Sequence, residues 1–290
     1  MNQIKILLKD YLKDKERIYE FILILWKIIN YPKNLFLKLR NKSIKKKYFD
    51  EFRLSNGIIE IKHGEFLSKF HTSSKFEYYK IKIGSQFENV FFEKLFKIIK
   101  KGMTIYDIGG SVGIYTIPFA NKVGSDGKVF VFEPTQKGCS SIESNLKLNH
   151  LQNVTIYPYA VSDINSTSSF YIRPDKETHS LFEKTVAPSK IAAHEEIKVK
   201  TFTIDYLIEK KLTSPPNIIK IDTEGAEIKI LDGMTKIINS LEYILIEIHK
   251  PALKLENILN PEKIIENKLK KLGFKKFDYL SGSHLLASKI

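Results

Sequence analysis

The chain has almost no cysteine, and its N-terminal apolar run is too short to cross a membrane. Cys139 is the single cysteine among 290 residues, which excludes an intrachain disulfide and a cysteine-based zinc site. Residues 18–29 are apolar apart from Glu20 and Lys27, whereas a membrane span needs roughly twenty apolar residues. No small-residue cleavage site follows this stretch, so it does not resemble a secretory signal. A reducing, cytoplasmic location is therefore expected.

Acidic residues are scarce relative to basic ones, and the imbalance is local. The formal net charge is +14, and residues 1–50 hold 13 Lys or Arg against 5 Asp or Glu. Two interpretations of this segment stay open. Residues 18–29 could form a helix packed on the catalytic domain, or a helix lying on an anionic membrane surface with Phe21 and Trp26 inserted. The second interpretation predicts a peripheral membrane contact.

The middle of the chain begins with the pattern of a strand, a glycine turn, a helix and a second strand. Apolar residues 104–108 precede the turn 109–113 (Gly-Gly-Ser-Val-Gly), and the apolar spacing of residues 114–120 favours a helix. Such glycines let the backbone turn tightly and let a ligand approach main-chain N–H groups. The second strand, residues 128–133, ends in a glutamate that could accept hydrogen bonds from both hydroxyls of a ribose. The pattern predicts a nucleoside cofactor site.

The spacing of the glycines separates two classes of cofactor. A dinucleotide fingerprint ending at Gly113 needs glycine at position 108, where the chain has Ile108. Asp107 stands two residues before the first glycine, and its carboxylate suits a cofactor with a cationic amino group better than a pyrophosphate. The turn therefore favours S-adenosylmethionine over NAD. An ordinary βαβ turn, whose glycines only allow close packing, is the alternative.

Three ordered blocks, at residues 107–116, 131–134 and 220–227, resemble the signature blocks of FkbM-type methyltransferases, which are class I S-adenosylmethionine-dependent enzymes. The resemblance runs from about residue 88 to about residue 249. Further matching positions are Asn145, Leu148-Asn149, Asn153-Val154, residues 160–163 and residues 201–205. The family usually has asparagine where this chain has Ser111.

This resemblance implies a fold and an activity. The expected fold is α/β and Rossmann-like, with a mostly parallel seven-stranded sheet and an antiparallel hairpin at its C-terminal edge. The expected activity is O-methyl transfer to a hydroxyl of a sugar, a glycan or glycolipid, or a natural product. The acceptor is accordingly a small molecule or a glycan.

Ligands of open α/β sheets bind beyond the carboxyl ends of the strands, so the residues at these ends are candidates. The resemblance implies that Asp107 faces the methionine part of the cofactor, that Glu133 binds the ribose, and that residues 160–163 contact the adenine. Asp163 would accept from the adenine amino group, or it is simply a turn residue. The predicted cofactor-binding residues are Asp107, Gly109, Gly110, Ser111, Gly113, Glu133, Ala160 and Asp163.

Methyl transfer to a hydroxyl needs alignment of the reactants and one proton acceptor. The predicted catalytic residues are Asp222, Glu224, His249 and Glu247. Helix capping is the alternative for Glu224 and Glu227, and a structural hydrogen bond is the alternative for His249. The same side chains could make an oxygen and nitrogen site for a hard divalent ion, but no compact ligand motif defines one, and no metal is predicted.

The substrate side and the remaining elements are predicted more coarsely. Residues 170–200 are expected to form a loop in which His179 and Ser180 orient the acceptor, with an ordinary surface loop as the alternative. Strands are predicted at residues 48–54, 58–61, 154–159, 217–222, 241–248, 275–279 and 284–288, and helices at 87–100, 140–148 and 261–272. The first two strands are predicted to form a hairpin joined at Asn56-Gly57, and strand-like stretches continue to about residue 83. The predicted parts are a basic helical extension (1–47), a small β-rich cap (48–86) and a methyltransferase domain (87–290).

Two other functions stay open. The charge and the 12% aromatic content are also found in nucleic-acid-directed methyltransferases and binding modules. Against this, the charge excess concentrates in one terminal segment, and no Asn/Asp-Pro-Pro-aromatic motif follows the fourth strand. The second alternative is a non-catalytic member that keeps the fold. The presence of all three acidic candidates, Asp107, Glu133 and Asp222, argues against it.

Overall fold

The computed structural model describes residues 46–173, 178–183, 194–236 and 238–290. The larger of two compact units comprises residues 58–72 and 80–290, and the described part of the smaller comprises 46–57 and 73–79. Among these residues no helix has the length and apolar character to cross a bilayer. The predicted helix at residues 18–29 lies outside the described residues, so both of its interpretations stay predictions. The division into three parts also stays a prediction.

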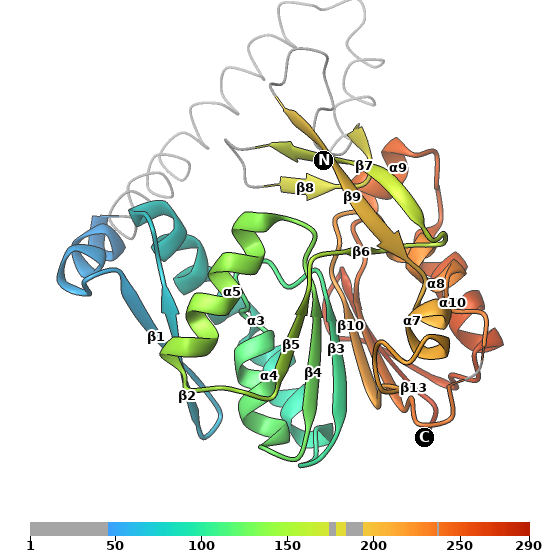
Figure 1. The fold of residues 1–290 in the computed structure, drawn as a ribbon, viewed down its shortest axis with the longest axis horizontal. Helices are drawn as coiled ribbons and strands as arrows, with labels where there is room; N and C mark the ends of the chain where they lie inside the picture. The colour runs from blue at the N-terminus through green and yellow to red at the C-terminus, as the bar shows by residue number, and fades with distance from the viewer. Residues whose placement is uncertain (1–45, 174–177, 184–193, 237) are drawn as a thin grey trace, which may run out of the picture. The chain divides into compact units, whose positions relative to one another are not determined.

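A seven-stranded sheet in the order β12-β13-β11-β10-β3-β4-β5 forms the centre of the larger unit (Figure 1). Its strands are β3 (Thr104–Ile108), β4 (Lys128–Phe132), β5 (Val154–Tyr157), β10 (Ile218–Ile221), β11 (Tyr243–Glu247), β12 (Lys276–Tyr279) and β13 (His284–Ser288). The first five are parallel to their neighbours in this group, whereas β13 runs antiparallel to β11 and β12. The predicted fold class and edge hairpin are confirmed.

Helices cover this sheet because both of its faces are apolar. In β3, Ile105 packs in one core cluster with Phe92 and Phe119, while Tyr106 packs in another with Ile230 and several later residues. A parallel sheet buried on both sides has this continuous apolar pattern. The helices are α3 (Lys75–Ile98), α4 (Thr116–Val123), α5 (Gln136–Leu148), α7 (Ile204–Glu209), α8 (Glu227–Asp232), α9 (Lys250–Leu255) and α10 (Pro261–Lys271). The predicted helices at 87–100, 114–120, 140–148 and 261–272 are confirmed in α3, α4, α5 and α10, with ends that differ by a few residues.

The prediction of a hairpin joined at Asn56-Gly57 is wrong. Residues 46–54 are helical. The hairpin lies further along the chain, between β1 (Ile58–His63) and β2 (Phe66–His71). Asn56 and Gly57 have φ angles of 52° and 74°, and they follow the helix instead. Asn-Gly supplies left-handed conformations, which end a helix as readily as they close a hairpin. The strand-like pattern expected as far as residue 83 also fails, because α3 begins at Lys75.

A second, four-stranded sheet has the order β6-β9-β7-β8. Its strands are β6 (Ala160–Val161), β7 (Ser166–Arg173), β8 (Thr178–Ser180) and β9 (Glu195–Phe202). The expected loop at residues 170–200 is therefore wrong where the structure describes this range. Alternation explains the strands. Phe170 and Val199 face a small core with Ala160, while Lys198 and Lys200, on either side of Val199, are exposed. Because β6 follows β5, this sheet starts at the carboxyl edge of the central sheet (Figure 1).

Candidate active site

Asp107 is the last but one residue of β3, and its side chain is completely buried. Its Oδ2 accepts a hydrogen bond from the Thr116 hydroxyl at 2.6 Å, and its Oδ1 lies 3.4 Å from the Nζ atom of Lys220. Burial raises the pKa of Asp107, and the neighbouring charge of Lys220 and the Thr116 hydrogen bond oppose this shift. The carboxylate is thus rigidly held at the strand end, where a ligand of this sheet would bind.

Packing requires the first two glycines of the turn. Gly109 has a φ of 86°, and a Cβ atom on it would lie 1.9 Å from the carbonyl oxygen of Asp222. A Cβ on Gly110 would lie 2.2 Å from a methyl group of Val131. The N–H groups of Gly109 and Gly113 donate to the carbonyls of Phe132 and Gly110, at 2.9 and 2.8 Å. Close packing therefore accounts for glycine at positions 109 and 110. The approach of Gly109 to the Asp222 carbonyl also brings the turn against the end of β10.

Glu133 follows β4 and is held on both of its carboxylate oxygens. Oε2 accepts from the N–H of Ser111 at 2.9 Å, and Oε1 accepts from the N–H and hydroxyl of Thr135 at 2.9 and 2.6 Å. Burial raises the pKa of Glu133, while these hydrogen bonds oppose the shift. Ser111 has a φ of 51°, and its main-chain N–H makes this contact. Both lone pairs of Oε1 are used by Thr135, whereas Oε2 keeps a further lone pair for a ligand hydroxyl.

The predicted adenine turn lies at the edge of the second sheet. Ala160 is buried in β6, and Asp163 is half-buried and accepts a hydrogen bond from the Ser162 hydroxyl at 2.9 Å. This contact is what a turn residue makes, and it leaves the other carboxylate oxygen available. The role of both residues in cofactor binding stays a prediction.

Three asparagines at family-matching positions have structural roles that the sequence did not reveal. Asn145 donates to the carbonyl of Val112 at 2.8 Å and accepts from the N–H of His71 at 2.8 Å. Asn149 donates to the carbonyl of Lys69 and accepts from its N–H, at 2.7 and 2.8 Å. Asn153 donates to two carbonyls at the end of α4. The amides of Asn145 and Asn149 tie the glycine turn and β2 to the C-terminal end of α5, because one amide can satisfy several backbone groups at once.

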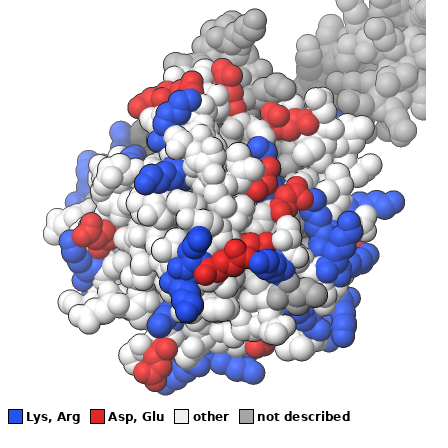
Figure 2. Space-filling model, turned by 45° about the vertical axis from the view of Figure 1, so that its right-hand side comes forward, with Lys and Arg blue, Asp and Glu red and all other residues white. Residues whose placement is uncertain are grey.

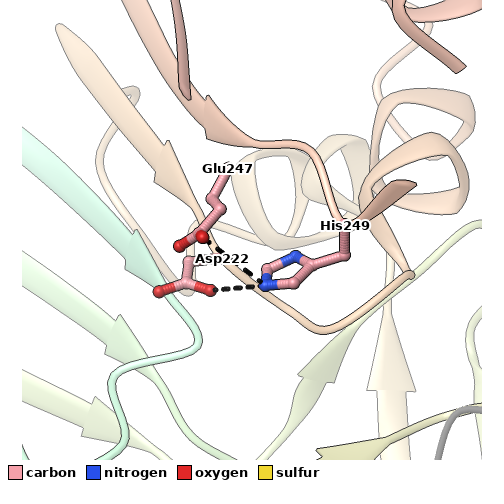
Figure 3. Close-up of side chains that lie close together, drawn as sticks. All are labelled: Asp222, Glu247 and His249. Carbon is pink, nitrogen blue, oxygen red and sulfur yellow. Dashed lines mark ion pairs between the residues drawn. The ribbon is translucent and has the colours of Figure 1, made fainter. Parts of the chain in front are cut away.

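The four predicted catalytic residues meet at the ends of β10 and β11, as Figure 3 shows for three of them. The Nε2 atom of His249 lies 3.6 Å from Asp222 Oδ1, 3.6 Å from Glu224 Oε2 and 3.9 Å from Glu247 Oε1. Glu247 also lies 3.4 Å from the imidazole of His284. Residues 25 positions apart in the sequence become neighbours because the two strands are parallel and adjacent.

A fourth acid, Glu227, holds His249 from the other side. Its side chain is completely buried, and its Oε1 lies 2.8 Å from His249 Nδ1 and accepts from the N–H of Gly225 at 3.0 Å. Burial lowers the pKa of His249, but the hydrogen bond to Glu227 and the charges of Asp222, Glu227 and Glu224 raise the pKa to about 10. His249 is therefore an imidazolium at neutral pH. Glu227 does begin α8, as helix capping predicted, but its carboxylate is used by His249.

The remaining acids of the cluster differ from one another. Burial raises the pKa of Asp222, but the positive charges of Lys220 and His249 outweigh this effect and lower the pKa below its ordinary value. Burial raises the pKa of Glu224, with His249 opposing it. The side chain of Glu224 is 44% exposed, compared with 29% for Asp222. Of these two acids, Glu224 has the more exposed and the more basic carboxylate.

Ser180 contributes to the site through the backbone. It is buried, and its hydroxyl donates to the carbonyl of Glu224 at 2.9 Å and accepts from the N–H of Phe182 at 3.1 Å. Glu224 has a φ of 50°, so this bond fixes a left-handed residue whose side chain faces His249. The predicted acceptor role of Ser180 stays a prediction, and the side chain of His179 lies outside the described residues.

Lys220 is the residue that sequence reasoning missed. Its side chain is 5% exposed, and its Nζ lies 3.2 Å from Asp222 Oδ2 as well as near Asp107. The available signal was a lysine within the otherwise apolar strand 218–221, because lysine is almost never buried unless it is paired.

These features can be set beside known proteins. Residues 107–276 match the family model described as the methyltransferase FkbM domain, which is more than half of the chain. The chain belongs to the FkbM methyltransferase family. Residues 32–163 also match the model of protein-L-isoaspartate(D-aspartate) O-methyltransferase. The family prediction and the prediction of a methyltransferase are confirmed.

Two curated relatives match part of this chain. Hexuronic acid methyltransferase AglP of Haloferax volcanii is 27% identical over 149 residues, which are 50% of this chain and 55% of the relative. Methyltransferase 1 of Beauveria bassiana is 26% identical over 145 residues, which are 45% and 57% of the respective chains. The chain spans about half the length of the curated relatives it matches.

Solved structures with a similar fold include two methyltransferases. A SAM-dependent methyltransferase from Aquifex aeolicus has a TM-score of 0.42 and 16% identity, covering 72% of this chain and 95% of the other. A SAM-dependent O-methyltransferase from Thermotoga maritima has a TM-score of 0.40 and 16% identity, covering 70% and 65%.

The FkbM domain also brings together atoms that could bind a metal. Asp222, Glu247 and His249 each offer one ligand atom, all within 4.8 Å of one another. Oxygen and imidazole donors of this kind fit a divalent ion. However, the ammonium group of Lys220 already lies 3.2 Å from Asp222 Oδ2 and neutralises part of the charge that would attract an ion. Because Lys220 already pairs with this carboxylate, we do not propose a metal at this position.

Proposed function

We propose that this FkbM protein is an S-adenosylmethionine-dependent O-methyltransferase whose acceptor is a sugar hydroxyl. One observation carries the proposal: parallel pairing of β3 with β10 brings Asp107 and the turn 109–113 beside Asp222 and its cluster. A cofactor-type carboxylate and a proton-accepting cluster therefore occupy one edge of the sheet. The family membership supports the same reaction class.

The cofactor end fits S-adenosylmethionine better than NAD. Oδ1 of Asp107 is buried and accepts no hydrogen bond from the described residues, apart from its ion pair with Lys220. It can receive the amino group of the methionine part, and Glu133 can accept from the ribose hydroxyls. Gly109 and Gly110 are enclosed by Asp222 and Val131, and the N–H of Ser111 is taken by Glu133. Few main-chain donors thus remain for a pyrophosphate.

When bound, the cofactor supplies an electrophilic methyl group on a sulfonium. The residues of this chain would orient the acceptor and remove its proton. Glu224 is the proposed base, because its carboxylate is partly exposed and its pKa is raised. His249 is protonated at neutral pH and cannot accept that proton, so we assign to it the orientation of Asp222 and Glu224. Asp222 and Glu247 would accept hydrogen bonds from the acceptor hydroxyls.

The acceptor class follows from the cluster and from one relative. Several carboxylates at one edge suit a ligand with several hydroxyl donors, as a sugar has. The name of the Haloferax volcanii relative says that it methylates a hexuronic acid, and we extend this class to the present chain. Figure 2 shows basic and acidic side chains intermingled on the face it presents, so the described residues on this face do not form the continuous basic surface typical of nucleic-acid binding.

Labelled methyl transfer tests this proposal. The protein is incubated with methyl-labelled S-adenosylmethionine and, separately, p-nitrophenyl β-D-glucuronide, p-nitrophenyl β-D-glucoside or a short RNA, and products are identified by mass spectrometry. Methylation of a sugar hydroxyl is expected. Transfer to the RNA alone, or calorimetric binding of NAD in place of S-adenosylmethionine, would reject the proposal.

A further inference from the structure

The position of Lys220 is imposed by the central sheet. It lies in β10, opposite Asp107 of β3 in the parallel register, and alternation places it on the same face of β10 as Ile218. The flanking residues Ile219 and Ile221 belong to the core cluster on the other face. The lysine is therefore built into a rigid strand between the two ends of the site.

Its ammonium group contacts both ends at once. Nζ lies 3.4 Å from Asp107 Oδ1 and 3.2 Å from Asp222 Oδ2, and it donates to the carbonyl of Gly109 at 3.4 Å. It also lies 4.7 Å from the centre of the Tyr115 ring. One charge thus joins the cofactor carboxylate, the glycine turn and a carboxylate of the acceptor cluster.

Electrostatics explains why such a bridge matters. Two poorly exposed carboxylates near one another repel, and each is costly to ionise away from water. An ammonium between them allows both to stay charged and fixes the separation between them. Removing only the ammonium would leave Asp107 facing an uncompensated Asp222, so that Asp107 would lose its charge or its position. Neutralising Asp222 as well would relieve Asp107 again.

We propose that Lys220 is a positioning residue that couples the cofactor end to the acceptor end, by holding Asp107 and Asp222 on either side of one ammonium group. This inference rests on the proposed function, since it takes Asp107 as the group that receives the cofactor. A role in folding alone would not link cofactor affinity to Asp222. In the proposed role, neutralising Asp222 changes the affinity for the cofactor when Lys220 is absent, but hardly changes it when Lys220 is present.

A double-mutant cycle measured by titration calorimetry with S-adenosylmethionine tests the coupling. Lys220→Met keeps the length of the side chain and removes the charge, and it should weaken binding by about tenfold or more. Asp222→Asn alone should change the affinity by less than about threefold, and Lys220→Met with Asp222→Asn should recover at least about threefold of the loss. A double variant as weak as Lys220→Met, or a folded Lys220→Met that binds like the wild type, would overturn the proposal.

Two further variants separate this role from the general loss of a lysine charge and from a failure to fold. Lys198→Met removes an exposed lysine paired with Glu196, and it should leave the affinity unchanged. If Lys220→Met does not fold, Lys220→Arg decides: it should bind within about threefold of the wild type, and a folded Lys220→Arg that loses binding contradicts a bridge based on charge. A wild type that does not bind S-adenosylmethionine rejects the proposed function and this inference together, whereas wild-type binding unaffected by Lys220→Met rejects this inference alone.

Discussion

The proposed cofactor end and the proposed acceptor end of this site are both made of carboxylates, but the groups that hold them differ in kind. At the proposed cofactor end, Asp107 and Glu133 are almost completely buried and are bonded mainly by hydroxyl and N–H donors from their own βαβ unit, and Lys220 of β10 adds one charge beside Asp107. At the acceptor end, Asp222, Glu224 and Glu247 are partly exposed and surround one imidazolium. Neutral donors fix a geometry, whereas shared charges also set which groups are ionised. The first arrangement suits an invariant cofactor, and the second suits proton transfer with a variable acceptor.

The largest expected effect tests the cofactor end. Asp107→Asn removes the buried charge that would receive the cofactor's amino group, and it should weaken S-adenosylmethionine binding by about a hundredfold or more in calorimetry. Asp126→Asn, an exposed acid in the loop after α4, is the matched control and should bind normally. Equal affinities of Asp107→Asn and Asp126→Asn for S-adenosylmethionine would mean that Asp107 does not belong to the cofactor end.

The next effect tests the acceptor end. Glu224→Gln should lower kcat about a hundredfold with little change in the affinity for S-adenosylmethionine, because a general base contributes about 10² to 10⁴ in rate. Because burial raises the pKa of Glu224 and the base must be ionised, the wild-type rate should rise with pH through that raised pKa and then level off. Glu143→Gln on the surface of α5 is the control. If the rate of Glu224→Gln still rose with pH as the wild-type rate does, another residue would be the base.

Stability against pH sharpens the role of His249. Its pKa is raised from 6.5 to about 10, so its contribution to the free energy of unfolding is fully present below pH 6.5 and is lost as the pH rises to about 10. This contribution should be about 5 kcal/mol, and thermal melting followed from pH 6.5 to 10 should show the decline. Glu227→Gln weakens the hold on the imidazolium and lowers its pKa in the folded state, so the decline should be smaller and should end at a lower pH. Identical profiles for wild type and variant would contradict this account.

The smallest effect concerns metal removal. Because His249 and Lys220 already neutralise part of the cluster, treatment with EDTA followed by gel filtration should change the methyl-transfer rate by less than about twofold. Loss of activity that Mg²⁺ or Mn²⁺ restores would show instead that Asp222, Glu247 and a deprotonated His249 bind an ion.

Sequence patterns predicted most of the fold, because local periodicity defines strands and helices that the core then buries. They failed where one local signal serves two structures. Asn56-Gly57 follows a helix instead of closing a hairpin, and the polar alternation of β7 and β9 resembled a loop. Glu227 had the position of a capping acid, and the approach of His249, 22 residues away in the sequence, gives its carboxylate a second partner besides the N–H of Gly225.

By itself, the sequence determined the order of strands and helices, the glycine turn with its flanking acids, and the family. These depend on interactions within a few residues or on motifs that are contiguous in the chain. Only the tertiary structure decided that Lys220 bridges Asp107 and Asp222, that His249 is charged, and that Asn145 and Asn149 tie β2 to α5. Those features depend on burial and on distances between separate strands, which arise only when the parallel sheet forms and water is excluded from around its charges.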